Sequence, residues 1–136
     1  MKKRSCNRFY IPGATLHYRE SSFFFLKGKF TQDYFPVINL SKGGAKFLSN
    51  KRLTPGKDLL IRLNIPGQEN SYEIMADVRW ISRNPEQSYK YQTGISFKSF
   101  GNGRKKNSKK ILDFLTNLEN SAGQLESPVE NLAQRH

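Results

Sequence analysis

The chain has 136 residues, which is long enough for one domain with a hydrophobic core but not for two. It contains 23 lysines and arginines against 11 aspartates and glutamates, a formal net charge of +12, so its surface attracts nucleic acid, anionic membranes or phosphorylated small molecules. A single cysteine excludes an intrachain disulfide, and no apolar run approaches the length of a membrane-spanning helix.

The positive charge is distributed unevenly along the chain. Of the 23 basic side chains, only Arg135 lies beyond residue 110. We therefore expect an anion-binding surface within residues 1–110. The basic stretch Met1–Arg4 is followed by polar residues rather than by the apolar segment of a signal peptide, so we expect a cytoplasmic protein.

Most of the chain has the alternating apolar and polar pattern of β-strands. Turn signals such as Pro55-Gly56, Pro66-Gly67 and Asn84-Pro85 separate the predicted strands. These strands are expected at residues 14–19, 34–38, 45–48, 59–65, 72–80 and 91–97. The aromatic stretch at residues 23–30 is either a further strand or a packed loop.

One helix follows the strands. Ser108 is a suitable N-cap, and a single face of the predicted helix then carries Ile111, Leu112, Leu115 and Leu118. Such a stripe predicts a helix that covers one end of a small antiparallel barrel, since closure of the barrel leaves no exposed strand edge. The domain is expected to span residues 1–120, and the polar residues 121–136 to form a flexible tail.

Two short clusters carry the groups best suited to bind a ligand, and the first is an arginine pair. Arg4 and Arg8 have the spacing R-x-x-x-R, and a guanidinium donates paired hydrogen bonds to phosphate or to the O6 and N7 atoms of guanine. Roughly one such pair is expected by chance in this basic chain, and Arg79 with Arg83 forms a second. The pair alone also fits a solvated basic N-terminus.

The second cluster has the spacing N-x-S-x-x-G at the end of a predicted strand. Asn39 and Ser41 offer short hydrogen-bonding groups, and Gly44 allows a positive φ and a close approach of the backbone. Taken alone, the cluster also fits an ordinary turn in which Asn and Ser bond to their own backbone.

The order of these clusters resembles the PilZ domain family, which binds the bacterial second messenger cyclic di-GMP. Arg4 and Arg8 match the arginine pair of the family, and Asn39, Ser41 and Gly44 match its second motif. The turn and strand patterns of the family are matched by residues 53–59, 78–80 and 94–97. The resemblance covers about residues 3–118 and implies an all-β fold: a six-stranded antiparallel barrel with one C-terminal amphipathic helix.

The resemblance also implies a function. The chain would be a non-enzymatic cyclic di-GMP sensor that needs no cofactor besides this ligand. Arg4 and Arg8 would bond guanine edges and phosphates, Asn39 and Ser41 the other guanine and its ribose-phosphate, and Gly44 would leave room for a base. Residues 1–9 would be mobile and become ordered on binding, and the signal would pass to a downstream protein partner of unknown identity.

Two alternatives keep a similar fold. One is a PilZ-like adaptor that binds no nucleotide, which is disfavoured because both motifs are intact. The other is a basic nucleic-acid-binding β-barrel, which would need aromatic side chains in a basic groove; we do not expect nucleic acid to be the partner.

The remaining residue types point to no further chemistry. The sequence shows no metal-ligand spacing and no Ser/His/Asp, Cys/His or paired-carboxylate arrangement, so we expect neither a metal site nor catalysis. Trp80 is expected to pack in the barrel rather than to stack on a base.

Overall fold

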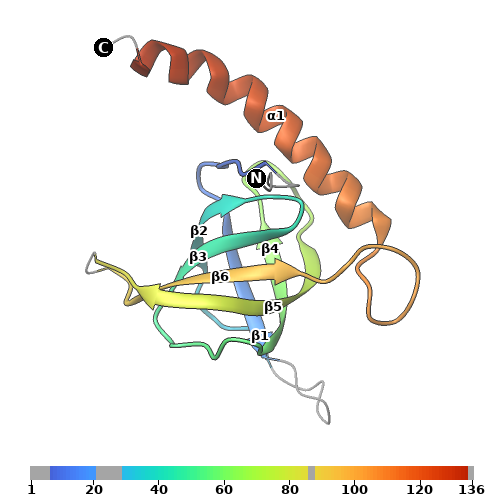
Figure 1. The fold of residues 1–136 in the computed structure, drawn as a ribbon. Helices are drawn as coiled ribbons and strands as arrows, with labels where there is room; N and C mark the ends of the chain where they lie inside the picture. The colour runs from blue at the N-terminus through green and yellow to red at the C-terminus, as the bar shows by residue number, and fades with distance from the viewer. Residues whose placement is uncertain (1–6, 21–28, 86–87, 135–136) are drawn as a thin grey trace, which may run out of the picture.

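The computed structural model of the chain describes residues 7–20, 29–85 and 88–134, and the side chains of the terminal helix as far as residue 122. Six strands and one helix follow one another along the chain (Figure 1). They are β1 (Thr15–Glu20), β2 (Phe35–Leu40), β3 (Gly44–Ser49), β4 (Asp58–Asn64), β5 (Tyr72–Arg83), β6 (Tyr91–Phe97) and α1 (Lys109–Gln134). The aromatic stretch at residues 23–28 lies outside the described residues.

The six strands close into one antiparallel barrel with the order β1–β2–β3–β6–β5–β4. Strand β1 pairs with both β2 and β4, so that closure leaves no strand with a free edge. Strand β5 is the longest, with 12 residues, and runs beside β6 as a hairpin that projects past the barrel wall (Figure 1). The predicted fold, a six-stranded antiparallel barrel with one C-terminal helix, is confirmed.

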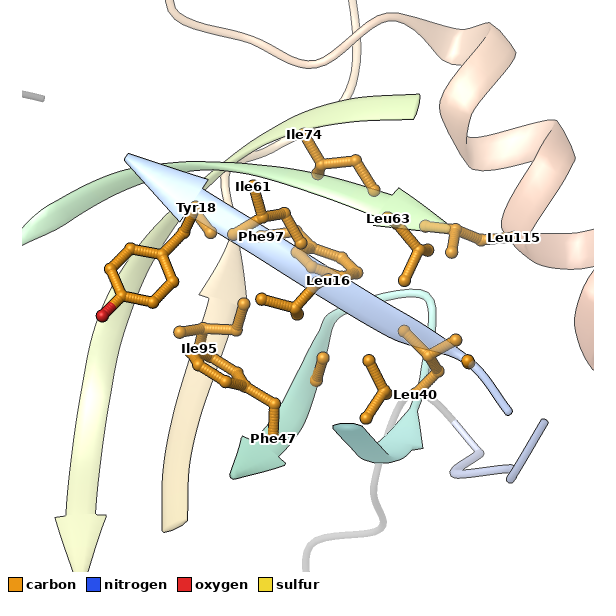
Figure 2. Close-up of a cluster of buried hydrophobic side chains, with 14 of the residues drawn as sticks. Leu16, Tyr18, Leu40, Phe47, Ile61, Leu63, Ile74, Ile95, Phe97 and Leu115 are labelled. Atoms are coloured by element: carbon orange, nitrogen blue, oxygen red, sulfur yellow. The ribbon is translucent and has the colours of Figure 1, made fainter. Parts of the chain in front are cut away.

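Side chains that point inward fill the barrel, as Figure 2 shows. Leu16, Phe47 and Ile61 come from three different strands, and each is fully buried. Burying an aliphatic or aromatic side chain of this size stabilises the folded state by about 1.5–3 kcal/mol. Leu115 from α1 is also fully buried, so the apolar stripe of the helix covers one open end of the barrel, as the sequence predicts.

Helix α1 is longer than the sequence predicts. It continues to Gln134, through the segment for which we predict a flexible tail. Ala122 is only 1% exposed, so the packing of α1 on the barrel extends past residue 120. The rest of the helix projects away from the barrel (Figure 1), and the boundary of the domain stays a prediction. Among the described residues, no helix is long and apolar enough to cross a membrane.

Two β-bulges shift the alternation of side chains. In β2 the register shifts between Val37 and Asn39, so that Leu40 points into the core and Asn39 points outward. In β5 the shift immediately precedes Trp80, which is 39% exposed. Ile81 instead points toward the core and packs against it. A bulge re-aims the side chains that follow it, and these two turn polar and aromatic groups to the outside of the barrel.

Candidate functional site

One surface cavity of about 360 Å³ brings the two predicted motifs together. Arg8, Asn39, Ser41 and Gly44 all line it, although the arginine lies far from the other three in the sequence. Its remaining walls come from β3, β5 and β6, which are neighbours in the barrel. Arg4, the other arginine of the first motif, lies outside the described residues.

Backbone pairing positions Arg8. The N–H of Phe9 donates to the carbonyl oxygen of Leu40 at 2.8 Å, and the N–H of Leu40 donates to the carbonyl oxygen of Phe9 at 2.8 Å. Both side chains are buried, so the pair is fixed to the core. Because neighbouring side chains on a strand point to opposite faces, Arg8 is directed outward next to Asn39 and Ser41. The N-terminal segment is therefore anchored at residue 9.

The hydroxyl of Ser41 is oriented by the turn between β2 and β3. Its Oγ accepts hydrogen bonds from the N–H groups of Gly43 and Gly44 at 3.0 and 3.1 Å. The backbone N–H of Ser41 donates to the carbonyl oxygen of Gly44 at 2.8 Å, which closes the turn. Its one proton is directed at the carbonyl oxygen of Gly44, at 3.5 Å. Ser41 thus serves the turn, and its hydroxyl lies at the edge of the cavity.

The amide of Asn39 is available to a ligand. It is partly exposed, and no hydrogen bond of its side chain is found within the described residues. An amide offers two donor hydrogens and an acceptor oxygen, which can match the edge of a base. The bulge in β2 gives this amide its outward direction.

Gly44 is needed for one of the two reasons that the sequence suggests, the close approach of the backbone, and not for the other. Its φ is not positive, so left-handed backbone is not the constraint. Instead, a Cβ atom at this position would lie 2.2 Å from the carbonyl oxygen of Ile95 on the neighbouring strand β6. Only glycine allows β3 to approach β6 so closely at the floor of the cavity.

A second glycine accounts for the position of Trp80. A Cβ atom on Gly94 would lie 2.3 Å from Nε1 and Cε2 of the indole, so the ring lies directly on the backbone of β6. Trp80 lines the cavity and is 39% exposed, so it packs on the outer wall of the barrel and not in the core. The strict alternation of β5 in the sequence points Trp80 inward together with Val78, whereas the bulge between them turns it outward.

The cavity is strongly positive. Its lining contains three cations, Arg8, Lys46 and Arg79, and no acidic side chain. None of these three cations forms an ion pair within the described part of the chain. Arg79, which the sequence sets aside as part of a chance arginine pair, thus belongs to the cavity. Such a lining favours an anionic ligand.

The cavity offers groups that can bind a ligand. The lining holds guanidiniums, an ammonium, an amide, hydroxyls and an exposed indole. Among the described residues, no group of three or more His, Cys, Asp and Glu side chains is arranged to hold a metal ion. The arrangement can bind anionic groups by hydrogen bonds and a planar ring by stacking.

Comparison with known proteins identifies the family. The family model of the PilZ domain matches residues 3–116, so the chain belongs to the PilZ domain family. No curated protein sequence matches the chain.

Solved structures agree with this fold. The chain is similar to the PilZ domain with c-di-GMP of YcgR from Escherichia coli, with a TM-score of 0.67 and 17% identity over 96% of this chain and 98% of that one. YcgR in complex with c-di-GMP from Escherichia coli matches with a TM-score of 0.64 and 18% identity, over 98% of this chain and 50% of that one. The Bacillus subtilis inhibitor of motility (MotI/DgrA) gives a TM-score of 0.59 and 16% identity, over 89% of this chain and 53% of that one. The chain therefore spans about half the length of the last two proteins.

The two glycines of the cavity give a testable contrast. Gly94→Ala should displace the flexible indole of Trp80, the only tryptophan, and shift its fluorescence emission, with a change in unfolding free energy below about 1 kcal/mol. Gly44→Ala should destabilise the fold by about 1–3 kcal/mol, because its methyl group meets a backbone carbonyl. Fluorescence and urea unfolding measure both effects. Unchanged emission in Gly94→Ala would contradict the stacked position of the indole.

Proposed function

We propose that this PilZ domain is a non-enzymatic receptor for cyclic di-GMP. The observation that carries the proposal is that residues of both motifs line one positive cavity next to an exposed indole. Cyclic di-GMP presents two phosphates and two guanines, which require cations, hydrogen-bonding edges and stacking surfaces. The similarity to a PilZ domain solved with c-di-GMP supports the same assignment.

The arginine pair would bind guanine and phosphate. Arg8 lies in the cavity, and Arg4 is four residues earlier on the same short segment. A guanidinium can donate two parallel hydrogen bonds to O6 and N7 of guanine or to two phosphate oxygens. Two such groups can therefore bind one base and its phosphate from a single stretch of chain.

Asn39 and Ser41 would bind the other half of the ligand. The amide of Asn39 would pair with the edge of the second guanine, and the hydroxyl of Ser41 would exchange its long bond to the carbonyl oxygen of Gly44 for one to the ribose-phosphate. The absence of a side chain at Gly44 would leave room for a base. The hydrogen bonds of the turn between β2 and β3 support this role, since they hold the Ser41 hydroxyl at the edge of the cavity before binding.

Trp80 and Arg79 extend the site beyond the two motifs. The exposed face of the indole suits stacking of a guanine, an interaction worth about 1–3 kcal/mol per base. Arg79 would add a cation toward a phosphate. A dinucleotide would thus contact groups from β2, β3, β5 and β6 and from the N-terminal segment.

Closure of the N-terminal segment over the ligand would produce the signal. The cavity is at the small end of the range for ligand pockets, so a ligand with two bases would extend beyond it, and Arg8 of the N-terminal segment lies at its wall. Asn7 of this segment donates from Nδ2 to Oε2 of Glu119 on α1 at 3.4 Å. Movement of the segment would therefore reach α1, from which a downstream protein partner could read the bound state.

Binding of the ligand is the first test. We expect calorimetry with the purified chain to give a dissociation constant in the micromolar range or tighter, about −8 kcal/mol or better, and much weaker binding of linear GMP. The salt dependence should be shallow, because few phosphates are bound; a nucleic-acid-binding barrel would show a steep slope. No heat and no thermal shift at about 100 µM cyclic di-GMP would contradict the proposal.

Substitutions test the assigned residues. Arg8→Ala and Arg4→Ala should each weaken cyclic di-GMP binding by about 100-fold, since each loses a charge-assisted, bidentate contact of about 2–3 kcal/mol. Trp80→Ala should weaken binding by about 10-fold or more. Arg79→Ala should also weaken it, because this cation lines the cavity. Arg104→Ala, an exposed arginine outside the cavity, is the matched control and should bind normally.

Cys6 reports closure of the segment. It is the only thiol in the chain and lies between Arg4 and Arg8. Our proposal is that the polar and basic residues around it stay mobile without a ligand, because they have little apolar surface to offset a backbone entropy of about 1–2 kcal/mol per residue. Saturating cyclic di-GMP should therefore slow the reaction of Cys6 with a thiol reagent. In Arg8→Ala the same ligand concentration should have no effect, and equal rates in the parent protein would refute closure even if binding is confirmed.

A further inference from the structure

A second cavity, of about 440 Å³, lies at the far end of the β5–β6 hairpin and has no role in the proposed receptor function. It is lined by Arg52, Ile81, Ser82, Arg83 and Tyr91 and shares no lining residue with the first cavity. The second R-x-x-x-R pair of the sequence is thereby divided: Arg79 lines the first cavity, whereas Arg83 lines the second.

Three chain segments form the second cavity. The register pairs Tyr91 of β6 with Arg83 of β5 on one side and with Ser49 of β3 on the other. Arg52 follows the end of β3, so it approaches from the side of Ser49. The cavity thus brings together two guanidiniums that are 31 positions apart in the sequence.

The segment that carries Arg52 is fixed. The hydroxyl of Ser49 donates to the carbonyl oxygen of Lys51 at 3.2 Å and lies 3.0 Å from the hydroxyl oxygen of Thr93 inside the barrel. Leu53, next to Arg52, is 1% exposed and anchors the segment in the core. Arg52 therefore projects from a backbone that is held on both sides.

The end of the hairpin that carries Arg83 is fixed as well. The N–H of Asn84 donates to the carbonyl oxygen of Lys90 at 2.8 Å, and its Nδ2 donates to the carbonyl oxygen of Tyr89 at 2.9 Å. Its Oδ1 accepts from Nε2 of Gln92 at 3.1 Å. The N–H of Lys90 donates to Oδ1 of Asn50 at 3.3 Å, which ties the hairpin to the segment before Arg52.

Two like charges are thus held at one cavity without compensation. Neither Arg52 nor Arg83 forms an ion pair with an acidic side chain in the described ranges. Both side chains are exposed, and their like charges repel each other at this cavity. An anion between them would remove the repulsion and accept bidentate hydrogen bonds from both. The fixed backbones beneath the two side chains lower part of the entropic cost of binding.

We propose that this cavity is a second ligand site, specific for a small molecule that carries a phosphate monoester and a planar organic group. A phosphate monoester carries a charge of about −1.5 to −2 at neutral pH, which matches two guanidiniums, whereas a carboxylate matches one. Ile81 and the ring of Tyr91 supply apolar surface for the organic group, and the volume falls within the range of small-molecule pockets.

NMR titration of the full chain with GMP, a phosphate monoester on a planar base, tests the proposal. At constant ionic strength, GMP should shift the backbone amide signals of Ser82 and Tyr91 in a saturable way at roughly 1 mM or below, and guanosine should not. Arg83→Ala and Arg52→Ala should each weaken this binding at least about 10-fold, and Arg83→Lys should weaken it less, because the charge stays while the planar fork is lost. Arg104→Ala is the control without effect.

Arg8→Ala separates the two sites. This variant should lose cyclic di-GMP binding at the first cavity but keep the GMP shifts at Ser82 and Tyr91. Loss of those shifts in Arg8→Ala would mean that GMP occupies the first cavity, and the second site would be refuted. Shifts that do not saturate, that guanosine reproduces, or that survive both Arg52→Ala and Arg83→Ala would refute it too.

Discussion

The site depends on two interruptions in the regular alternation of β-strands. A strand without a bulge would send Asn39 and Trp80 into the barrel, since each lies two positions after a buried valine. The bulges in β2 and β5 shift the alternation of inward and outward side chains by one residue. Leu40 therefore points into the core, while the amide of Asn39 and the indole of Trp80 face outward. One extra residue in each strand thus preserves the apolar core and at the same time creates a polar outer wall.

The second constraint is the lack of side chains at two neighbouring positions on that wall. Gly44 allows β3 to approach the carbonyl of Ile95, and Gly94 allows the indole of Trp80 to lie on β6. Both positions belong to the β3–β6 pair, in which Gly44 is opposite Ser96 and Gly94 is opposite Lys46. The floor of the cavity is therefore backbone, and the groups that can bind a ligand stand around it. A recess on the outside of a closed barrel needs such positions, because side chains would otherwise fill it.

The sequence predicted the barrel and part of the site, and the failures have specific physical causes. Regular alternation and the apolar stripe of the helix report burial directly, so the strands and the contact of Leu115 with the barrel were predictable. The motif residues Arg8, Asn39, Ser41 and Gly44 were predicted, and they meet in one cavity. Trp80 was missed because a bulge leaves no mark in an alternating pattern. Arg79 was missed because nothing in the sequence distinguishes it from the other exposed cations of a basic chain. The full length of α1 was missed because polar residues can continue a helix that packing has already started.

Pairing of charges, rather than their number, distinguishes the cavities from the rest of a basic surface. The ion pairs found in the described residues join Glu20 to Lys51 and Lys57, Glu73 to Arg62, and Asp58 to Lys98. None of these residues lines either the first or the second cavity. Cations elsewhere on the strands are thus partly neutralised within the fold, while Arg8, Lys46 and Arg79 face a cavity without a carboxylate. A uniform charge of +12 would attract any polyanion, whereas unpaired cations beside a hydrogen-bonding amide and an exposed indole select a compact anion that carries a base.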